Sequence, residues 1–438
     1  MSEVPTWKQM RATCIVAGEH CDQRVAHGEI TMVGSRVTPV TRRSGIKMLA
    51  GVATAGALAG LPGGRARGQS SDVLTIGGVG SLSGGGTNWG LAIQRGTLMA
   101  IDEVNKAGGL KVGEKTWRIE HKMYDDQYSA QGGATAATRL VNEDKVKHIV
   151  GPISSAAALA VLGVTQPAKV IVMSGGFALG VLKNDNHAEY NFRVHNTPPE
   201  FMPALIAWLA KTYPDKKRIS FIAGNDATGQ SVVPQLTKTY EAAGLTVAYT
   251  DFFERGTREF TPLLRRAIAA KIDIFDLDGN TPADSGLMVR QIRQAGFRGL
   301  IIQAGGPAME QVMEIAGAQA EGFQSYDMLD FNSERGKAFL AHYRAMGWSG
   351  IMDAQTGVFY TAAKVLFEAM RRSGSTDPDV LKTVIPKIDN FDSGVYQRIS
   401  WGGLREYGVN HQMLSPFFIS EVRDGKIAAA AELFPPAG

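Results

Sequence analysis

From Asp72 onward, short apolar runs alternate with stretches in which apolar residues recur every three or four positions. The first run, Val73-Leu74-Thr75-Ile76, leads into a glycine-rich turn and then into a predicted helix over 88–105. Further strands are predicted at 149–150, 170–173, 219–222, 247–249, 274–277 and 300–302, and helices near 199–212, 229–243, 259–271, 285–295 and 308–316. Repeated strand–helix units build parallel sheets that helices cover on both faces. The pattern therefore predicts an α/β fold with doubly wound parallel sheets.

The strand–helix units fall into two series, one that runs to about Phe192 and one that starts at about Arg218. Two lobes are a more natural solution for such a length than one large sheet. After Gly322 the pattern changes to long helices at 333–346 and 354–373, followed by strand-like segments at 396–401 and 417–422. No linker-like composition separates this tail from the rest, so we expect it to pack back onto the lobes.

Residues 1–68 are interpreted as an untranslated or leader region followed by a cleaved export signal. The pair Arg42-Arg43 precedes a weakly apolar run over 48–61 that three glycines interrupt, as in a twin-arginine signal peptide. A membrane-spanning helix needs about 20 apolar residues, so this run predicts no membrane insertion. The sequence thus predicts a periplasmic protein.

Removing this segment changes the charge and the thiol content of the chain. The whole sequence carries a formal net charge of +4, but the part after residue 68 is close to neutral, which gives no electrostatic case for nucleic acid binding. Both cysteines, Cys14 and Cys21, lie in the removed part. The remainder therefore has no thiolate nucleophile, no cysteine-ligated zinc and no disulfide.

Several stretches in this order and spacing resemble the leucine/isoleucine/valine-binding proteins of ABC importers. They include Leu82-Ser83-Gly84 with Trp89-Gly90, Ala100 to Asn105, Tyr124 to Gln127, Ile149 to Pro152 with Ser154-Ser155, Arg258 to Leu264, and Ile315-Ala316-Gly317. The resemblance implies the type I periplasmic binding fold, in which two lobes exchange the chain three times. It places lobe 1 at 72–195 and 327–415, and lobe 2 at 196–326 and 416–434.

The same resemblance implies a function and a set of partners. A small-molecule ligand would bind in the cleft, the lobes would close on it about the hinge, and a membrane permease would receive it. The chain would act as a monomer without a cofactor. A ligand sensor that presents its closed form to a membrane receptor is the alternative of another class.

Ligand-binding roles carry over to eight positions: Trp89, Ser154, Ser155, Gly176, Ala178, Thr228, Asn280 and Gly305. At Ser154-Ser155 a hydroxyl would meet the free amides of a helix N-terminus, a good site for a carboxylate. Serine is also an ordinary N-cap, Trp89 could be a core residue, and threonine and asparagine are common in turns. Each position therefore has a purely structural alternative.

Two departures from the family pattern bear on the ligand. Ala178 lacks a hydroxyl, and 303–306 lacks the acidic residue that accepts the ammonium group of an amino acid in the family. A buried ammonium group without a partner costs several kcal/mol. The sequence therefore predicts a small apolar or aromatic carboxylate without an ammonium group. The alternative is an amino acid whose ammonium group meets Asp278 or Asp226.

The sequence contains little that indicates an enzyme. The glycine-rich turn over 77–86 follows a strand and precedes a helix, but Ser83 stands where a dinucleotide-binding loop needs its third glycine. An exported nucleotide-dependent redox enzyme is therefore only a remote alternative. The histidines lack metal-ligand spacing, and no Ser-His-Asp arrangement with a nucleophile elbow is present. We predict no catalytic residue and no metal site.

Overall fold

The computed structural model describes residues 72–183, 188–306, 308–350 and 352–435, which belong to one compact unit of the chain. The predicted leader and export signal lie outside these residues. The described part contains two sheets. Strand order is β12-β13-β6-β5-β4-β1-β3-β2 in the first and β15-β14-β11-β10-β9-β7-β8 in the second. The predicted α/β class with two mainly parallel sheets is confirmed.

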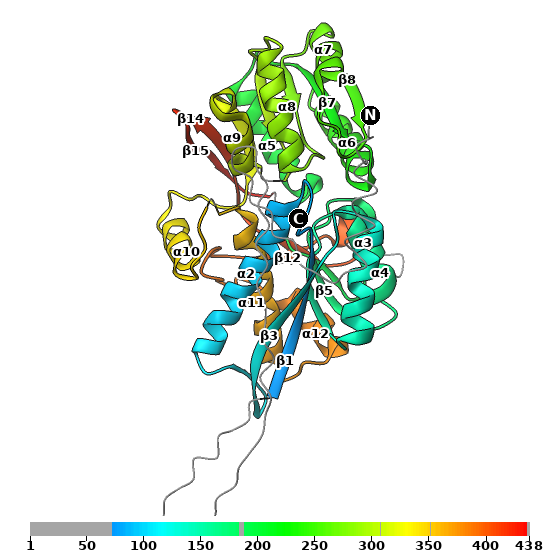
Figure 1. The fold of residues 1–438 in the computed structure, drawn as a ribbon, viewed down its shortest axis with the longest axis vertical. Coiled ribbons are helices and arrows are strands. Elements are labelled where there is room, and N and C mark those ends of the chain that lie inside the picture. The colour runs from blue at the N-terminus through cyan, green and yellow to red at the C-terminus, as the bar shows by residue number, and fades with distance from the viewer. Residues whose placement is uncertain (1–71, 184–187, 307, 351, 436–438) are drawn as a thin grey trace, which may run out of the picture. The chain divides into compact units, whose positions relative to one another are not determined.

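Helices cover both faces of the first sheet. Its strands are β1 (Asp72–Gly80), β2 (Leu110–Val112), β3 (Lys115–Asp125), β4 (His148–Val150), β5 (Ile171–Ser174), β6 (Asn191–Arg193), β12 (Ser400–Gly402) and β13 (Gln412–Leu414). Helices α2 (Thr87–Lys106) and α11 (Gln355–Ser373) pack together on one face, and α3 (Ala130–Thr138) and α4 (Ser155–Thr165) on the other (Figure 1). The short helix α12 (Pro378–Val384) contacts α11.

The second sheet is built in the same way. Its strands are β7 (Arg218–Gly224), β8 (Thr246–Phe253), β9 (Ile274–Asp276), β10 (Leu300–Gln303), β11 (Phe323–Asp327), β14 (Phe417–Arg423) and β15 (Lys426–Leu433). Its helices are α5 (Pro198–Thr212), α6 (Ala227–Ala242), α7 (Thr261–Ala269), α8 (Pro282–Gln294) and α9 (Met309–Ala316). Strands β7 to β11 pair in parallel, whereas β14 and β15 pair antiparallel along one edge.

The chain passes between the two sheets three times. It leaves the first sheet after β6, returns after β11 to form α10 (Glu334–Ala345) and α11, and crosses again between β13 and β14. The Asn196 side chain connects two of these passages, because its Nδ2 donates to the carbonyl oxygen of Ser415 at 2.7 Å. The tail predicted to pack onto the lobes thus contributes strands to both sheets.

Several predicted elements need correction. The fully buried strand β11 over 323–327 has no counterpart among the predicted elements and precedes the predicted helices. The strand predicted over 396–401 is reduced to the three-residue β12. Strand β3 was not predicted from the sequence. Polar residues alternate along it, because it lies next to the edge of the sheet and only the short strand β2 lies beyond it. Within the described ranges, no helix is both long and apolar enough to cross a membrane.

Candidate functional site

A cavity lies between the two lobes at the carboxyl ends of their strands, the usual ligand position in such sheets. The first lobe contributes Trp89, Tyr128, Ile153 and Phe177, and the second contributes Thr228, Asp278, Gly279, Asn280, Gly305 and Gly306. We call this the cleft cavity. It offers about 20 Å³ of room, little more than one water molecule needs. A ligand larger than a water molecule therefore needs the lining residues to move apart.

The first-lobe wall of the cleft cavity is aromatic. The rings of Trp89 and Tyr128 lie 6.2 Å apart at an angle of 39°, and the ring of Phe177 packs 4.7 Å from the imidazole of His195. Trp89 and Phe177 are also buried parts of the main hydrophobic core. Such a wall suits an aromatic ring, an alkyl chain or the face of a cation.

The second-lobe wall presents three oxygen atoms that have no hydrogen-bond partner. They are Thr228 Oγ1, Asp278 Oδ2 and Asn280 Oδ1, and all three are buried. Asn280 Nδ2 donates to the carbonyl oxygens of Ile222 and Leu277 at 2.7 and 2.9 Å, so its Oδ1 is left as an acceptor. A buried polar atom without a partner costs roughly 1–3 kcal/mol. This wall is therefore suited to a ligand group that donates hydrogen bonds.

The carboxyl group of Asp278 lies against 303–306, the stretch that lacks the acidic residue of the family. A Cβ atom added at Gly305 would lie 2.6 Å from Asp278 Oδ2, so the carboxyl group already fills the room in front of the end of β10. Its Oδ1 accepts from the backbone N–H of Gly279 at 2.6 Å. Burial, and then the charge of Asp276, raise the pKa of Asp278 well above its usual value. Without a cation beside it, burial favours the neutral form of this group.

Arg255 fixes the loop that carries Asp278 and Asn280. Its Nε donates to Asp226 Oδ2 at 2.9 Å, one terminal nitrogen donates to Asp284 Oδ2 at 2.8 Å, and the other donates to the carbonyl oxygen of Gly279 at 2.7 Å. Asp226 also accepts from the first amides of α6. Asp226 is thus fully engaged, and of the two aspartates considered from the sequence only Asp278 lines the cleft cavity.

The predicted carboxylate site lies beside the cleft cavity. Ser154 caps α4, because its Oγ accepts from Ala157 N at 3.3 Å. Ser155 Oγ accepts a hydrogen bond from Ala178 N at 3.0 Å, so two groups predicted to donate to the ligand are bonded to each other. The hydroxyl proton of Ser155 is still available to donate. Gly176 is buried, and the next residue, Phe177, lines the cleft cavity.

The eight predicted positions therefore divide into two groups. Trp89, Thr228, Asn280 and Gly305 line the cleft cavity, whereas Ser154, Ser155, Gly176 and Ala178 do not. The sequence analysis missed five lining residues, namely Tyr128, Ile153, Phe177, Gly279 and Gly306. Their positions could have indicated them, because each of the five lies within a few residues after the end of a strand.

The glycine-rich turn is held by the two acidic residues at the end of β3. Asp125 accepts from the amide of Leu82 at 2.8 Å and from the hydroxyl of Ser83 at 2.6 Å, and Asp126 accepts from the hydroxyl of Ser81 at 2.6 Å. These contacts give the acidic pair a structural role and leave two carboxylates where a phosphate loop would need anion-binding amides.

The described residues offer no counterpart of a metal centre, since no group of three or more metal-ligating side chains is placed to hold an ion. Burial lowers the pKa of His121, His148 and His195 to about 4, so these imidazoles are neutral near pH 7. None of them lines the cleft cavity.

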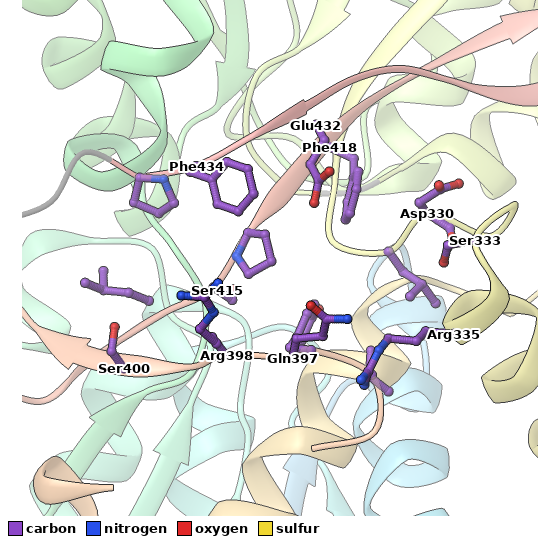
Figure 2. Close-up of a pocket in the computed structure, with 16 residues that line it drawn as sticks. Asp330, Ser333, Arg335, Gln397, Arg398, Ser400, Ser415, Phe418, Glu432 and Phe434 are labelled. Atoms are coloured by element: carbon purple, nitrogen blue, oxygen red, sulfur yellow. The ribbon is translucent and has the colours of Figure 1, made fainter. Parts of the chain in front are cut away.

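A larger cavity of about 670 Å³ lies by two of the chain crossings, away from the predicted site residues. Segments 329–335, 395–400, 414–418 and 432–435 line it. Figure 2 shows Arg398 and Gln397 on one side of this hollow and Phe418, Glu432 and Phe434 on the other. Its volume alone does not make it the ligand site, because it contains none of the eight residues and several of its side chains are exposed.

Two α/β lobes that exchange the chain three times and enclose a cavity at their strand ends define a two-lobed binding protein. The model of the periplasmic binding protein family matches residues 73–426, so the chain belongs to this family. The resemblance inferred from the sequence is thereby confirmed.

Three proteins illustrate the similarity. A leucine-, isoleucine-, valine-, threonine- and alanine-binding protein of Pseudomonas aeruginosa is 24% identical over 316 residues, which are 71% of this chain and 81% of that protein. A leucine-binding protein of Thermotoga maritima matches with a TM-score of 0.72 and 23% identity over 83% of this chain and 99% of its own. An ABC transporter solute-binding protein of R. palustris, in complex with 4-hydroxybenzoate, matches with a TM-score of 0.70 and 19% identity over 84% and 98%.

Proposed function

We propose that this chain is the periplasmic solute-binding component of an ABC importer, which captures a small ligand by lobe closure and delivers it to a membrane permease. The observation that supports this proposal is the cleft cavity, whose walls come from both lobes and whose second-lobe oxygens lack partners. A ligand that satisfies those oxygens stabilises the closed form over the open one.

The three unpartnered oxygens indicate the kind of ligand. A primary ammonium group has three N–H donors and one positive charge, which match Thr228, Asn280 and the ionised form of Asp278. The prediction of a ligand without an ammonium group depended on the missing acid at 303–306, and Asp278 lies against that place. We therefore propose a small amine with an apolar or aromatic body, including apolar amino acids whose carboxylate would meet Ser155 and the start of α4.

A second candidate is the small aromatic or apolar carboxylate without an ammonium group that the sequence predicts. The raised pKa of Asp278 supports it, because a neutral carboxyl group can donate a hydrogen bond to a carboxylate. The aromatic wall fits either candidate equally well.

Side-by-side calorimetry on the purified protein separates the candidates. The panel contains leucine, phenylalanine, phenethylamine, the keto acid of leucine and 4-hydroxybenzoate. We expect binding by the amine-bearing compounds only, and a thermal-shift screen should agree, since a ligand at 100 times its Kd adds about 2.7 kcal/mol. Binding of the keto acid or 4-hydroxybenzoate, with the amines silent, would establish the second candidate instead.

The two remaining alternatives, a ligand sensor and an enzyme, can each be tested by a separate measurement. A sensor would act on a membrane receptor without any transport of the ligand, so uptake of labelled ligand by cells that contain and lack this chain distinguishes the two. An enzyme would convert the bound compound, so recovery of the ligand unchanged after prolonged incubation argues against turnover.

Export through the folded-protein route gives a further expected result. Replacing both Arg42 and Arg43 by lysine should leave the precursor in the cytoplasm, because that route reads the arginine pair. Cell fractionation measures this, with Arg65→Lys and Arg67→Lys as a matched control in the same segment. Undiminished periplasmic protein in the Arg42/Arg43 variant would contradict the proposal.

A further inference from the structure

The cavity of about 670 Å³ beside two chain crossings has walls from both sheets, and we call it the crossing cavity. Strands β12 and β13 of the first sheet contribute Ser400 and Leu414, and β14 and β15 of the second contribute Phe418 and Glu432. Its volume lies within the range of roughly 300–1,000 Å³ found for pockets that hold drug-sized molecules. Several of its side chains are exposed, so a ligand can enter it directly from solvent.

The first-lobe wall of the crossing cavity is fixed by contacts of its own. An isolated antiparallel bridge between Phe391 and Ile399 closes the loop that leads to Arg398. Arg335 of α10 donates to both carboxylate oxygens of Asp392 in this loop, each at 2.8 Å. The wall is therefore ordered before a ligand arrives, and binding does not have to supply the free energy for ordering it.

Arg398 is a cation on this wall that is available to a ligand. Its side chain is exposed, and it has no hydrogen bond or ion pair within the described part of the chain. The second arginine of the lining, Arg335, is already neutralised by Asp392. The planar guanidinium group of arginine matches the two oxygens of a carboxylate. The first-lobe wall is thus suited to a carboxylate group.

The opposite wall offers an acid. The side chain of Glu432 is exposed, and among the described residues it has no hydrogen bond or ion pair. Figure 2 shows Glu432 across the hollow from Arg398. Asp330 is a second acid in the lining, but one of its oxygens accepts from the amide of Asn332 at 2.8 Å. Two opposite charges thus line one cavity without pairing, and the second-lobe wall is suited to an ammonium group.

Apolar side chains lie along the rest of the crossing cavity. Phe434 is 61% exposed, although it is a large aromatic residue. Phe418 and Leu414 are half-buried in the same lining, and Val395 is buried. Covering such a surface removes apolar area from water and stabilises a complex. A matching ligand therefore has an apolar body between its two charged ends.

We propose that the crossing cavity is a second binding site, which takes a short zwitterionic peptide with apolar side chains. The terminal carboxylate of the peptide pairs with Arg398, its terminal ammonium group pairs with Glu432, and its side chains cover Phe434. A single amino acid carries both charged groups on one carbon atom, whereas each further extended residue adds roughly 3.3–3.6 Å of reach. The cleft cavity shares none of these residues, so the inference does not rest on the function proposed above.

Calorimetry with the tripeptide trileucine on the purified protein tests this site. The comparison compounds are N-acetylated trileucine, which has no ammonium group, trileucine amide, which has no carboxylate, and leucine. Exposed charge pairs contribute little, so each blocked end should weaken binding only about threefold, and added salt should reduce the difference. Leucine should bind more weakly than trileucine because it covers less of the apolar lining.

Three substitutions assign the charges to their residues. In Arg398→Gln, trileucine and its amide should bind equally, because the partner of the carboxylate is gone. In Glu432→Gln, trileucine and its acetylated form should bind equally for the corresponding reason. Phe434→Ala should weaken trileucine about tenfold through the lost apolar contact. The matched control is Arg405→Gln, an exposed arginine outside the cavity lining, which should keep the wild-type affinities.

The proposal is overturned if trileucine does not bind, or if leucine binds as tightly as trileucine. Binding that none of the three substitutions changes would place the peptide elsewhere on the protein and would also overturn it. All three side chains are exposed, so circular dichroism should show that the variants fold like the wild-type chain.

Discussion

Replacing Asp278 by asparagine is expected to weaken the binding of an amine-bearing ligand about a hundredfold while leaving the protein folded. A hydrogen bond to a charged group contributes roughly 1.5–3 kcal/mol, and each 1.4 kcal/mol or so is a factor of ten in Kd. Folding should be spared because burial already favours the neutral form of the free carboxyl group, and asparagine has nearly its shape. Calorimetry measures the loss, with the exposed Asp215→Asn as control in the same lobe.

The number of protons released on binding is a second test of whether Asp278 pairs with the ammonium group of the ligand. Asp278 has a raised pKa in the free protein, and an ammonium group would lower it, so binding should release a proton. Affinity for an amine should therefore rise with pH until Asp278 is ionised in the free protein as well. Calorimetry in buffers of different ionisation enthalpy detects the released proton. An unchanged Kd in Asp278→Asn together with no proton release would show that Asp278 is only structural.

A reciprocal exchange tests whether Asp278 takes the place of the missing acid. A side chain at Gly305 would collide with the Asp278 carboxyl group, so Gly305→Glu alone should abolish binding. Combining it with Asp278→Gly returns one acid to the same space from β10, and the double variant should regain part of the affinity for amines. No recovery would indicate that the two positions are not interchangeable.

The second large effect is expected at Arg255. Arg255→Met should lower the free energy of unfolding by about 3 kcal/mol, because it leaves Asp226 and Asp284 facing each other without their shared cation. It should also weaken ligand binding, since the loop that carries Asp278 loses its anchor on the Gly279 carbonyl. Urea unfolding measures the first effect and calorimetry the second.

Arg266→Met is the matched control for that substitution. Arg266 pairs with Asp251 at 2.8 Å, but the arginine side chain is 55% exposed, so the loss should stay below about 1 kcal/mol. Equal destabilisation by the two variants would mean that the Arg255 network has no special role.

The fold could be predicted from the sequence where burial sets the pattern. Helices such as α2, α5 and α11 begin and end within one or two residues of their predicted bounds, because their apolar faces repeat clearly and their ends are marked. Strand β11 was missed, since its sequence Phe-Gln-Ser-Tyr-Asp contains three polar residues that become buried only through pairing with β10 and β14. Such long-range pairing leaves no local periodicity.

The candidate site, too, could be predicted only in part from the sequence. The family resemblance was enough to select Thr228 and Asn280, which both follow strands and line the cleft cavity. The orientation of Asp278 was not accessible, because it depends on β9 lying beside β10, with Asp276 opposite Ile302. The sequence could name Asp278 as an option, but only this pairing places its carboxyl group against Gly305.

The contacts that hold the glycine-rich turn have a consequence for the proposed ligand site. A Cβ atom at Gly90 would lie 1.9 Å from the carbonyl oxygen of Ser81, so the start of α2 is packed directly against the turn that Asp125 and Asp126 fix. Trp89 therefore moves with the first lobe as part of a rigid body. The entropy of ordering this aromatic wall is lost during folding and not during ligand capture. A modest contact area with Trp89 can then yield more affinity than the same contact made by a mobile loop.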